Sequence, residues 1–341
     1  MSTRRARLVF CSVASTALLV GCGGSTKGAS TSGSPATGGK SFTVGYSVPT
    51  AQNPFLMSIE QAAVKTIAAA GGTVKFRDGQ LNSNKQVSDL QEFISDGVDS
   101  VIVAPAIVPA AVKGKFAQAR AAKIGVIAWD WEFSPNTLNG GPPAPPVQAQ
   151  VTADRTNVGK GLADAIGSQF HGGGQVLYVG LPFPVNGTDQ MFNTFQKELV
   201  AKGDKLLSRV NNGQDNAAGA RPLVDGALTQ YPNINAVVTY NGGSAIGAYQ
   251  ATSSAGRKNV LIYNAQIDQS SVAPQKQGQI AEQWELNPVE MGVQLGKMAI
   301  AEHQKAPLSN WAKTITVPSQ PYTPATIGQW ESYDSRLAKL P

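Results

Sequence analysis

The sequence of 341 residues is longer than one ordinary hydrophobic core supports, so two domains are expected. Hydrophobic residues make up 42% and charged residues 15%, which excludes a disordered chain and a multi-pass membrane protein. The formal charge of +6 includes Arg4, Arg5 and Arg7, and without them 25 basic residues face 22 acidic ones, so charge gives no support for nucleic-acid binding. With two Cys and two His, the chain has too few of these residues for a Cys/His zinc cluster or a disulfide framework, and His-dependent catalysis has little support.

The first 22 residues have the organisation of a secretory signal. Basic residues precede a short apolar run, Leu8–Val20, followed by Gly21 and Cys22, and the run is too short to span a bilayer comfortably. Residues 19–22 resemble the bacterial lipobox, in which the cysteine receives a diacylglycerol and becomes the mature N-terminus. The resemblance implies lipidation of Cys22 and export to the outer face of the cytoplasmic membrane, at the cell surface or in the periplasm. The alternative is an ordinary signal peptide with an incidental cysteine.

Residues 23–40 consist almost entirely of Gly, Ser, Thr, Ala and Pro. Such a composition cannot bury a hydrophobic core and is typical of a flexible linker. We therefore expect a globular body that begins near Phe42 and is tethered through this segment.

From Phe42 onward, short apolar runs alternate with stretches whose apolar residues recur at helical spacing. In chain order the first half is expected to form a strand at 42–47, a helix at 54–70, a strand at 74–76, a helix around 87–94, a strand at 101–104, a helix at 112–121 and a strand at 125–129. The second half is expected to form a helix at 157–170, a strand at 176–181, a helix at 188–202, a strand at 206–210, a helix at 220–230, a strand at 236–240, a helix through 246–249, strands at 260–263 and 280–284, a helix at 288–304 and a strand at 314–317. The Pro/Gly-rich segment 133–148 interrupts the pattern and is interpreted as a crossover between lobes. This alternation predicts an α/β fold with two doubly wound parallel-sheet lobes.

The candidate binding residues follow the predicted strands, because ligands of open parallel sheets bind outside the carboxyl ends of the strands. These residues are mostly amides, carboxylates and aromatics: Asn53, Phe55, Asp130, Trp131, Asp189, Gln190, Tyr240, Asn241, Asn264, Gln266, Trp284 and Asn287. Carboxylates and amides bridge adjacent hydroxyls, and an aromatic face covers the C–H side of a sugar ring. The residue types therefore favour a neutral polyhydroxyl ligand.

Several of these residues have a purely structural alternative. Asn53 stands where it could only cap a helix, and Asp189 could be a first-turn carboxylate that complements the helix dipole. Trp129 ends an apolar strand and fits the core. His171 and His303 lie at predicted helix ends, where they would cap carbonyl groups.

Motifs for other chemistries fail on their context. The phosphate-binding pattern GxxxxGK[ST] does not occur, and the HGGGQ stretch at 171–175 precedes a strand, whereas a dinucleotide-binding loop follows one. No Ser or Cys stands beside a His in a nucleophile-elbow pattern. The sequence therefore predicts a protein that is not an enzyme, with no catalytic residue, no metal and no cofactor, although Lys and Glu residues could still act as acid and base.

Residues 42–310 resemble the type I periplasmic sugar-binding proteins of bacterial ABC importers, the ribose-binding-like family. The resemblance is strongest in five segments: 46–63 (YSVPTAQNPFLMSIEQAA), 89–106 (DLQEFISDGVDSVIVAPA), 124–132 (IGVIAWDWE), 234–251 (INAVVTYNGGSAIGAYQA) and 280–292 (IAEQWELNPVEMG). It implies two lobes joined by a three-stranded hinge that close over one sugar. It assigns 41–132 plus about 285–312 to the N-terminal lobe and about 149–284 plus 313–341 to the C-terminal lobe. By motif it implicates Asn53, Phe55, Asp130, Asn241 and Gln266 in binding.

The chain departs from the ribose-binding pattern at three places. Ribose-binding members have Asp-Arg where Asp130-Trp131 stand, an Arg where Gln190-Met191 stand, and an Asp where Gln266 stands. These differences argue against ribose itself.

The segments AWD and GTDQ, together with Trp284, resemble a subgroup that binds rhamnose or the furanosyl autoinducer. In that subgroup Asp130, Asp189 and Gln190 would contact the ligand. The autoinducer binders also use a Lys near the position where this chain has Thr50. The absence of that Lys favours a neutral sugar or sugar alcohol here.

The function expected from the sequence is that of a monomeric substrate-binding lipoprotein. It would capture its carbohydrate in the interlobe cleft, with Trp131, Trp284 and Asn287 adding to the site, and deliver it to the permease subunits in the membrane. The alternatives are a receptor that presents its ligand to a sensor and, with less support, a surface carbohydrate-active enzyme with paired carboxylates.

Overall fold

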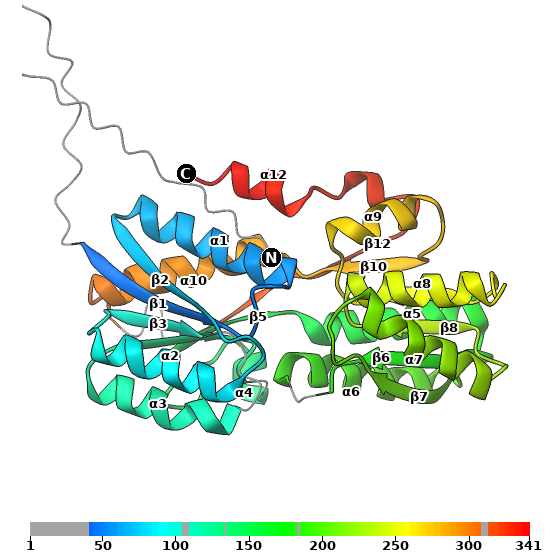
Figure 1. Cartoon of the computed structure of the whole chain (residues 1–341), viewed down its shortest axis with the longest axis horizontal. Helices are drawn as coiled ribbons and strands as arrows, with labels where there is room; N and C mark the ends of the chain where they lie inside the picture. Colours follow the sequence, from blue (N-terminus) through cyan, green and yellow to red (C-terminus); the bar gives the residue numbers. More distant parts are fainter. Residues whose placement is uncertain (1–40, 104–108, 133, 183–184, 308–312) are drawn as a thin grey trace, which may run out of the picture. The chain divides into compact units, whose positions relative to one another are not determined.

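The computed structural model describes residues 41–103, 109–132, 134–182, 185–307 and 313–341. Cys22, the signal segment and the linker lie outside these residues. Two lobes are present, each built on a six-stranded sheet with helices on both faces (Figure 1). The predicted α/β fold with two parallel-sheet lobes is confirmed.

The first sheet has the strand order β11-β5-β4-β3-β1-β2, and all of its pairs are parallel. Its strands are β1 (Phe42–Val48), β2 (Gly72–Asp78), β3 (Ser100–Val103), β4 (Gly125–Trp129), β5 (Ala149–Ala153) and β11 (Thr314–Val317). The central strands β3, β4 and β5 are buried throughout, as expected of parallel strands that helices cover on both faces.

Two pairs of helices cover the first sheet. The pairs are α1 (Pro54–Ala69) with α10 (Pro288–His303), and α2 (Ser83–Ser95) with α3 (Pro109–Ala121). Helices α1 and α10 pack so closely that a Cβ added to Gly292 would lie 2.1 Å from the carbonyl oxygen of Ile59. A side chain at that position would therefore separate the two helices.

The second sheet has the order β12-β10-β9-β8-β6-β7, in which only the edge strand β12 runs antiparallel. Its strands are β6 (Gln175–Gly180), β7 (Lys205–Asn211), β8 (Ala236–Thr239), β9 (Leu261–Asn264), β10 (Glu282–Glu285) and β12 (Gln320–Tyr322). The helices of this lobe are α5 (Arg155–Phe170), α6 (Asn186–Ala201), α7 (Ala217–Gln230), α8 (Gly242–Ser254) and α9 (Gln269–Lys276).

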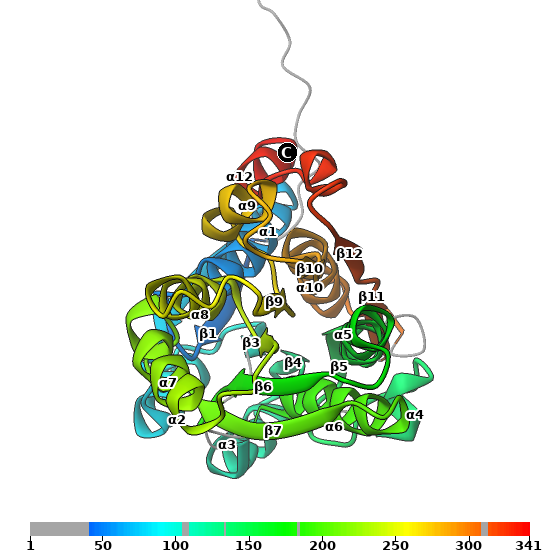
Figure 2. The ribbon, with the colours of Figure 1, turned by 90° about the vertical axis from the view of Figure 1, so that its right-hand side faces the viewer.

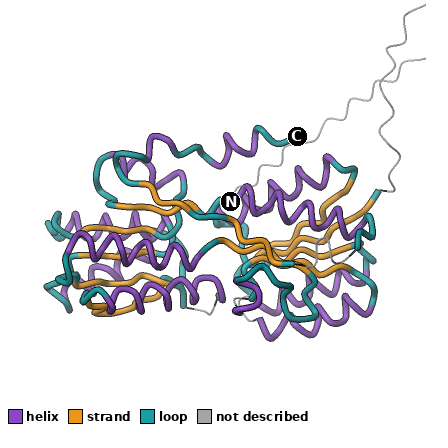
Figure 3. Tube along the Cα trace, turned by 180° about the vertical axis from the view of Figure 1, so that it is seen from behind, coloured by secondary structure: helices purple, strands orange, loops and turns teal. Residues whose placement is uncertain are grey.

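The chain crosses between the lobes three times, after β5, after β10 and after β11, so the three-stranded hinge is also confirmed (Figure 3). Hydrogen bonds from side chains and from the backbone connect the three crossings. The N–H of Asp154 donates to the carbonyl of Val317 at 3.0 Å, and the hydroxyl of Ser319 donates to the carbonyl of Asp154 at 3.0 Å. The side-chain amide of Asn287 donates to the carbonyl of Pro318 at 2.9 Å.

The lobe boundaries differ from the prediction. Segment 133–148, which contains α4 (Pro135–Leu138), is not a crossover, because it joins β4 to β5 within the first sheet. Strand β11 also belongs to that sheet, where Thr314 pairs with Gln150. The boundaries expected from the sequence place residues 149–153, where no strand is expected, and the strand at 314–317 in the second lobe. A Pro/Gly-rich composition marks where regular structure stops but does not show which sheet the next strand joins.

The C-terminal segment contains a short 3-10 helix, η1 (Ile327–Gln329), and helix α12 (Tyr333–Ala338). Helix α12 packs on α1 and α10 of the first lobe, and η1 packs on α9 of the second (Figure 2). The hydroxyl of Tyr333 donates to the carbonyl of Ile267, and Arg336 forms an ion pair of 2.8 Å with Glu285. The segment thus makes specific contacts with both lobes.

Within the described part of the chain, no helix is both long and apolar enough to cross a membrane.

Candidate functional site

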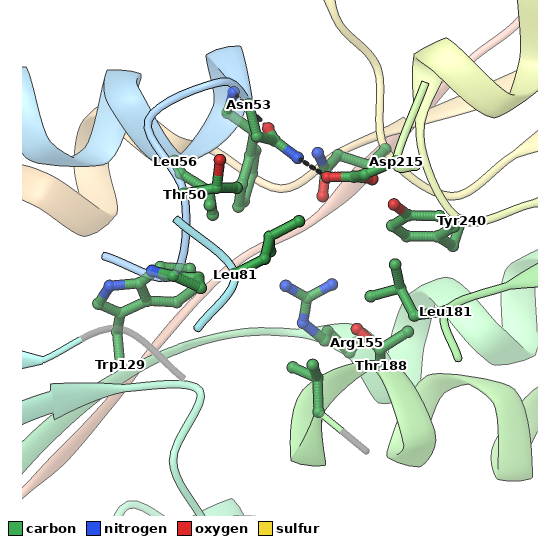
Figure 4. A pocket seen from close by; sticks show the side chains of 14 residues that line it. Thr50, Asn53, Leu56, Leu81, Trp129, Arg155, Leu181, Thr188, Asp215 and Tyr240 are labelled. Atoms are coloured by element: carbon green, nitrogen blue, oxygen red, sulfur yellow. Dashed lines mark hydrogen bonds between the residues drawn. The ribbon is translucent and has the colours of Figure 1, made fainter. Parts of the chain in front are cut away.

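A pocket lies at the carboxyl ends of the strands of both sheets (Figure 4). Its lining residues come from the last residue of β4 and from the loops and helix starts that follow β1, β2 and β5 to β9: Pro49, Thr50, Asn53, Phe55, Leu56, Leu81, Trp129, Arg155, Leu181, Val185, Thr188, Asp215, Tyr240 and Gln266. The cavity measures about 70 Å³, which is several times the roughly 10–15 Å³ that one water molecule needs. The position agrees with the general rule for ligand sites in open α/β sheets.

A carboxylate joins the two lobes across this pocket. Asn53 caps α1, because its Oδ1 accepts the N–H of Phe55 at 2.9 Å. Its Nδ2 donates to Oδ2 of Asp215 at 2.9 Å, and Nδ2 of Asn241 donates to Oδ1 of Asp215 at 2.6 Å. Asn241 in turn caps α8 by accepting the N–H of Ser244. Both amides are therefore fixed by helix starts, and Asp215 lies between them.

Burial raises the pKa of Asp215 from 3.8 to about 6. The two hydrogen bonds from Asn53 and Asn241 oppose this shift, while the nearby carboxylate of Asp268 adds to it. Desolvation outweighs the bonds because both donors are neutral amides. The pocket therefore contains a carboxyl group that titrates close to neutral pH.

A buried ion pair lies at another side of the pocket. Nε and Nη2 of Arg155 donate to Oδ2 of Asp130 at 2.8 and 2.6 Å, and both side chains are buried. Oδ1 of Asp130 accepts the N–H of Ala153 at 3.2 Å. A Cβ at Gly187 would lie 2.6 Å from Nε of Arg155, so a glycine is needed where α6 begins. Arg155 lines the cavity, and Asp130 holds it from behind.

The remaining wall of the pocket is largely apolar. Aromatic rings come from Phe55, Trp129 and Tyr240, and aliphatic side chains come from Leu56, Leu81, Leu181 and Val185. Such a wall excludes water around the polar groups, which strengthens hydrogen bonds to a bound molecule.

The predicted binding residues fall into three groups by position. Asn53, Phe55, Tyr240 and Gln266 line the pocket. Asp130, Asn241 and Asn264 lie one residue behind the lining. Asp130 bonds to Arg155, Asn241 to Asp215, and Asn264 to the carbonyl of Gln266. The other five do not line the pocket: Trp131, Asp189, Gln190, Trp284 and Asn287.

Three of these five have contacts elsewhere that explain their position. Trp131 packs its ring on Phe116, with centroids 4.9 Å apart. The indole N–H of Trp284 donates to Glu282 at 2.7 Å. Asp189 lies 3.6 Å from the guanidinium of Arg209.

The fourth, Asn287, bonds to the hinge crossing at Pro318 and is held in a left-handed backbone conformation, with φ at 53°. For the fifth, Gln190, nothing in the structure explains why its half-buried side chain is not in the lining.

Sequence reasoning missed several lining residues, notably Arg155, Asp215, Leu81 and Thr188. A signal existed for Arg155, because a buried carboxylate at Asp130 requires a cationic partner. A signal also existed for Asp215, which follows the predicted strand 206–210 at its carboxyl end.

Among the described residues, no group of three or more His, Cys, Asp and Glu side chains could hold a metal ion.

Comparison with known proteins supports the fold and the class of protein. A family model described as a periplasmic binding protein domain matches residues 44–306. The ribose import binding protein of Bacillus subtilis is 26% identical over 224 residues, which cover 65% of this chain and 69% of that protein. The corresponding protein of Escherichia coli K12 is 24% identical over 220 residues, covering 64% and 71%.

Solved structures show the same fold. The myo-inositol binding protein of Caulobacter, solved with myo-inositol, has a TM-score of 0.76 at 22% identity and covers 87% of this chain and 97% of that one. The arabinose transporter component of Shewanella sp. ANA-3, solved with L-arabinofuranose, has a TM-score of 0.75 at 21% identity, covering 86% and 95%. The matches confirm the type I periplasmic binding protein fold, and the names of the relatives agree with the prediction of a binding protein rather than an enzyme.

Proposed function

Because the chain belongs to the family of periplasmic binding protein domains, we propose that it captures a small neutral sugar or sugar alcohol between its lobes and delivers it to the permease of an ABC importer. The names of its relatives support this class of ligand, since they refer to ribose, arabinofuranose and myo-inositol. The family also supports export of the chain.

The observation that carries the proposal is the carboxylate of Asp215 held between amides of both lobes. Adjacent hydroxyls of a sugar can replace such amide-to-carboxylate bonds one for one, because each hydroxyl both donates and accepts. Gln266 and Arg155 add a further amide and a guanidinium to the same cavity. Phe55 offers an apolar surface for the C–H side of the ring.

Closure provides the transport signal in this proposal. A ligand that bonds to Asn53 of the first lobe and Gln266 of the second has more contacts in the closed form than in the open form. Its differential affinity then shifts the population toward the closed form, by bending at the hinge. The closed protein is the form that the permease would recognise.

The proposal includes a lipid anchor on Cys22, followed by the linker 23–40. Acyl chains add about 0.8 kcal/mol of membrane affinity for each buried CH₂ group, so several chains hold a protein at a bilayer. Expression of the full chain in a bacterium should place it in the membrane fraction, and Cys22→Ser should release it. Membrane association that survives Cys22→Ser would rule out the anchor.

The test of ligand capture is a thermal-shift panel of pentoses, hexoses, deoxysugars and polyols on residues 40–341, which form one compact unit. A ligand at about 100 times its Kd adds about 2.7 kcal/mol and should raise the Tm by a few degrees. Asn53→Ser keeps a helix cap but removes the amide donor, so it should weaken binding at least about tenfold.

Asn82→Ser is the matched control, because Asn82 caps α2 and does not line the pocket. Its affinity for the same ligand should equal that of the wild type. A panel without any shift would refute the carbohydrate ligand, and equal loss in both variants would refute the role of Asn53.

A further inference from the structure

The loop between β2 and α2 directs an aliphatic side chain, Leu81, into the pocket (Figure 4). Leu81 is 40% exposed and is one of three large hydrophobic residues that are exposed in the described part of the chain. The other two, Leu138 and Val200, do not line this pocket. An exposed leucine on a ligand pocket is informative because apolar surface gains free energy only when something covers it.

The backbone at Leu81 is held in an unfavourable conformation. Gln80 and Leu81 have φ values of 52° and 54°, in the left-handed region that residues other than Gly, Asn and Asp rarely adopt. Leu81 is the only aliphatic residue with a positive φ among the described residues. Such conformations persist where the surroundings enforce them and gather at functional sites.

Hydrogen bonds on both sides enforce this conformation. The N–H of Leu81 donates to the carbonyl of Pro49 at 2.7 Å, and the N–H of Gln80 donates to Oδ1 of Asp78 at 2.9 Å. The next residue, Asn82, caps α2 by accepting two backbone N–H groups. The loop therefore places Leu81 in one defined position rather than letting it turn away from the pocket.

The opposite lobe contributes more aliphatic surface to the same pocket. Leu181 and Val185, at the end of β6 and the start of α6, line the same cavity. Three polar side chains of the pocket are fixed by hydrogen bonds: Asn53 and Asp215 bond to each other, and Arg155 bonds to Asp130. A bound molecule that covers Leu81 would thus place an apolar group against the aliphatic side chains and its polar groups toward Asn53, Asp215 and Arg155 (Figure 4).

We propose that Leu81, together with Leu181 and Val185, selects a ligand that lacks a hydroxyl on this side: a deoxy or alkyl-substituted sugar whose methyl or methylene group lies against these side chains. This inference rests on the proposed function and names the class of sugar. A hydroxyl packed against these three side chains would lose its water partners without gaining a hydrogen bond from them. A methyl group there would instead cover the exposed part of Leu81.

The experiment compares sugars that differ at one such group, by isothermal titration calorimetry on residues 40–341. The pairs are L-rhamnose with L-mannose, L-fucose with L-galactose, and 5-methylthioribose with D-ribose. In a pair that binds, the deoxy or alkyl member should bind about ten- to hundredfold more tightly. Leu81→Asn should reduce the preference to within about threefold, because its amide can bond to the hydroxyl.

The variants are chosen to separate the side chain from the backbone. Asparagine accepts the left-handed conformation more readily than leucine does, so Leu81→Asn should fold with an unchanged or higher Tm. Leu81→Met stays apolar and should keep the preference. Gln80→Asn introduces an asparagine at the neighbouring residue, which has the same backbone conformation but does not line the pocket. This variant should also keep the preference for the deoxy or alkyl sugar.

Two results would overturn the inference while the proposed function stands. One is a hydroxylated sugar or polyol that binds as tightly as every deoxy or alkyl probe. The other is a preference that Leu81→Asn leaves unchanged. If no carbohydrate in these pairs or in the wider panel binds, the proposed function fails and this inference fails with it.

Discussion

Replacing Asp215 by asparagine should stabilise the protein near neutral pH. Asp215 is the carboxylate that accepts hydrogen bonds from Asn53 and Asn241, and burial raises its pKa from 3.8 to about 6. Asparagine is close in shape to the protonated acid and never carries the charge, but its Nδ2 replaces one of the two acceptor oxygens, which costs about 1 kcal/mol at any pH. The variant therefore measures what the ionised group costs the folded state.

The direction and size follow from the two pKa values. In the unfolded chain the carboxyl loses its proton near pH 3.8, whereas in the folded protein it keeps the proton until about pH 6. Between these values the folded state binds more protons, so the free energy of unfolding falls as pH rises, and the full cost is present above pH 6. A shift of about two units corresponds to about 2–3 kcal/mol.

The assay is thermal unfolding of wild type and Asp215→Asn at pH 7.5 and pH 4. For a chain of this size, 2–3 kcal/mol corresponds to about 4–6 °C in Tm. The Tm of the variant relative to the wild type should be higher by that amount at pH 7.5 than at pH 4. Asp225→Asn is the control, because Asp225 is an exposed carboxylate beside Arg221, and it should change the Tm by less than about 1 °C.

One result would refute this reasoning. If Asp215→Asn lowered the Tm at pH 7.5, the hydrogen bonds from Asn53 and Asn241 would stabilise the ionised form by more than burial destabilises it. A decrease that was equal at both pH values would show that the variant perturbs the packing rather than the charge.

Two further predictions concern packing and charge elsewhere in the first lobe and at the hinge. Arg155→Met leaves the carboxylate of Asp130 buried without its cation, so the free energy of unfolding in urea should fall by about 3–5 kcal/mol. Adding Asp130→Asn should restore most of this free energy. A decrease below about 1 kcal/mol in the single variant would contradict the role of the ion pair. Gly292→Ala places a Cβ against the backbone of Ile59 and should cost about 1–3 kcal/mol or more in the same assay. Gly328→Ala, where a Cβ meets nothing within 4 Å, should change stability by less than about 0.5 kcal/mol.

Most of the fold follows from periodicity in the sequence. The buried strand β3 and the capped start of α1 at Asn53 are both visible as local patterns, one as an apolar run and the other as Asn-Pro before helical spacing. Helix α9 was not expected, since it is short, polar and contains Pro274. Helix α12 depends on contacts with α1 and α10 that no local pattern records.

The binding site is less accessible from the sequence, for a physical reason. Residues that directly follow a strand can be found by position, and Asn53 and Gln266 were found in this way. Arg155 was overlooked because the neighbouring Asp154, which caps α5, already explains why the helix begins there. Leucine is a residue type that usually lies in the core. Only the backbone conformation of Leu81 and its hydrogen bond to Pro49 indicate that this leucine faces the pocket.

The bonds among the three crossings determine what kind of motion the hinge permits. Three separate single strands could bend and twist independently, but Asp154, Val317, Ser319, Asn287 and Pro318 connect them sideways through hydrogen bonds. Strands joined in this way behave as a ribbon, which bends across its flat face and resists torsion along its length. We expect opening to be a rotation about a single axis. Such a movement would return each lobe to the same register, so the same residues of the two lobes would form the pocket again on each closure.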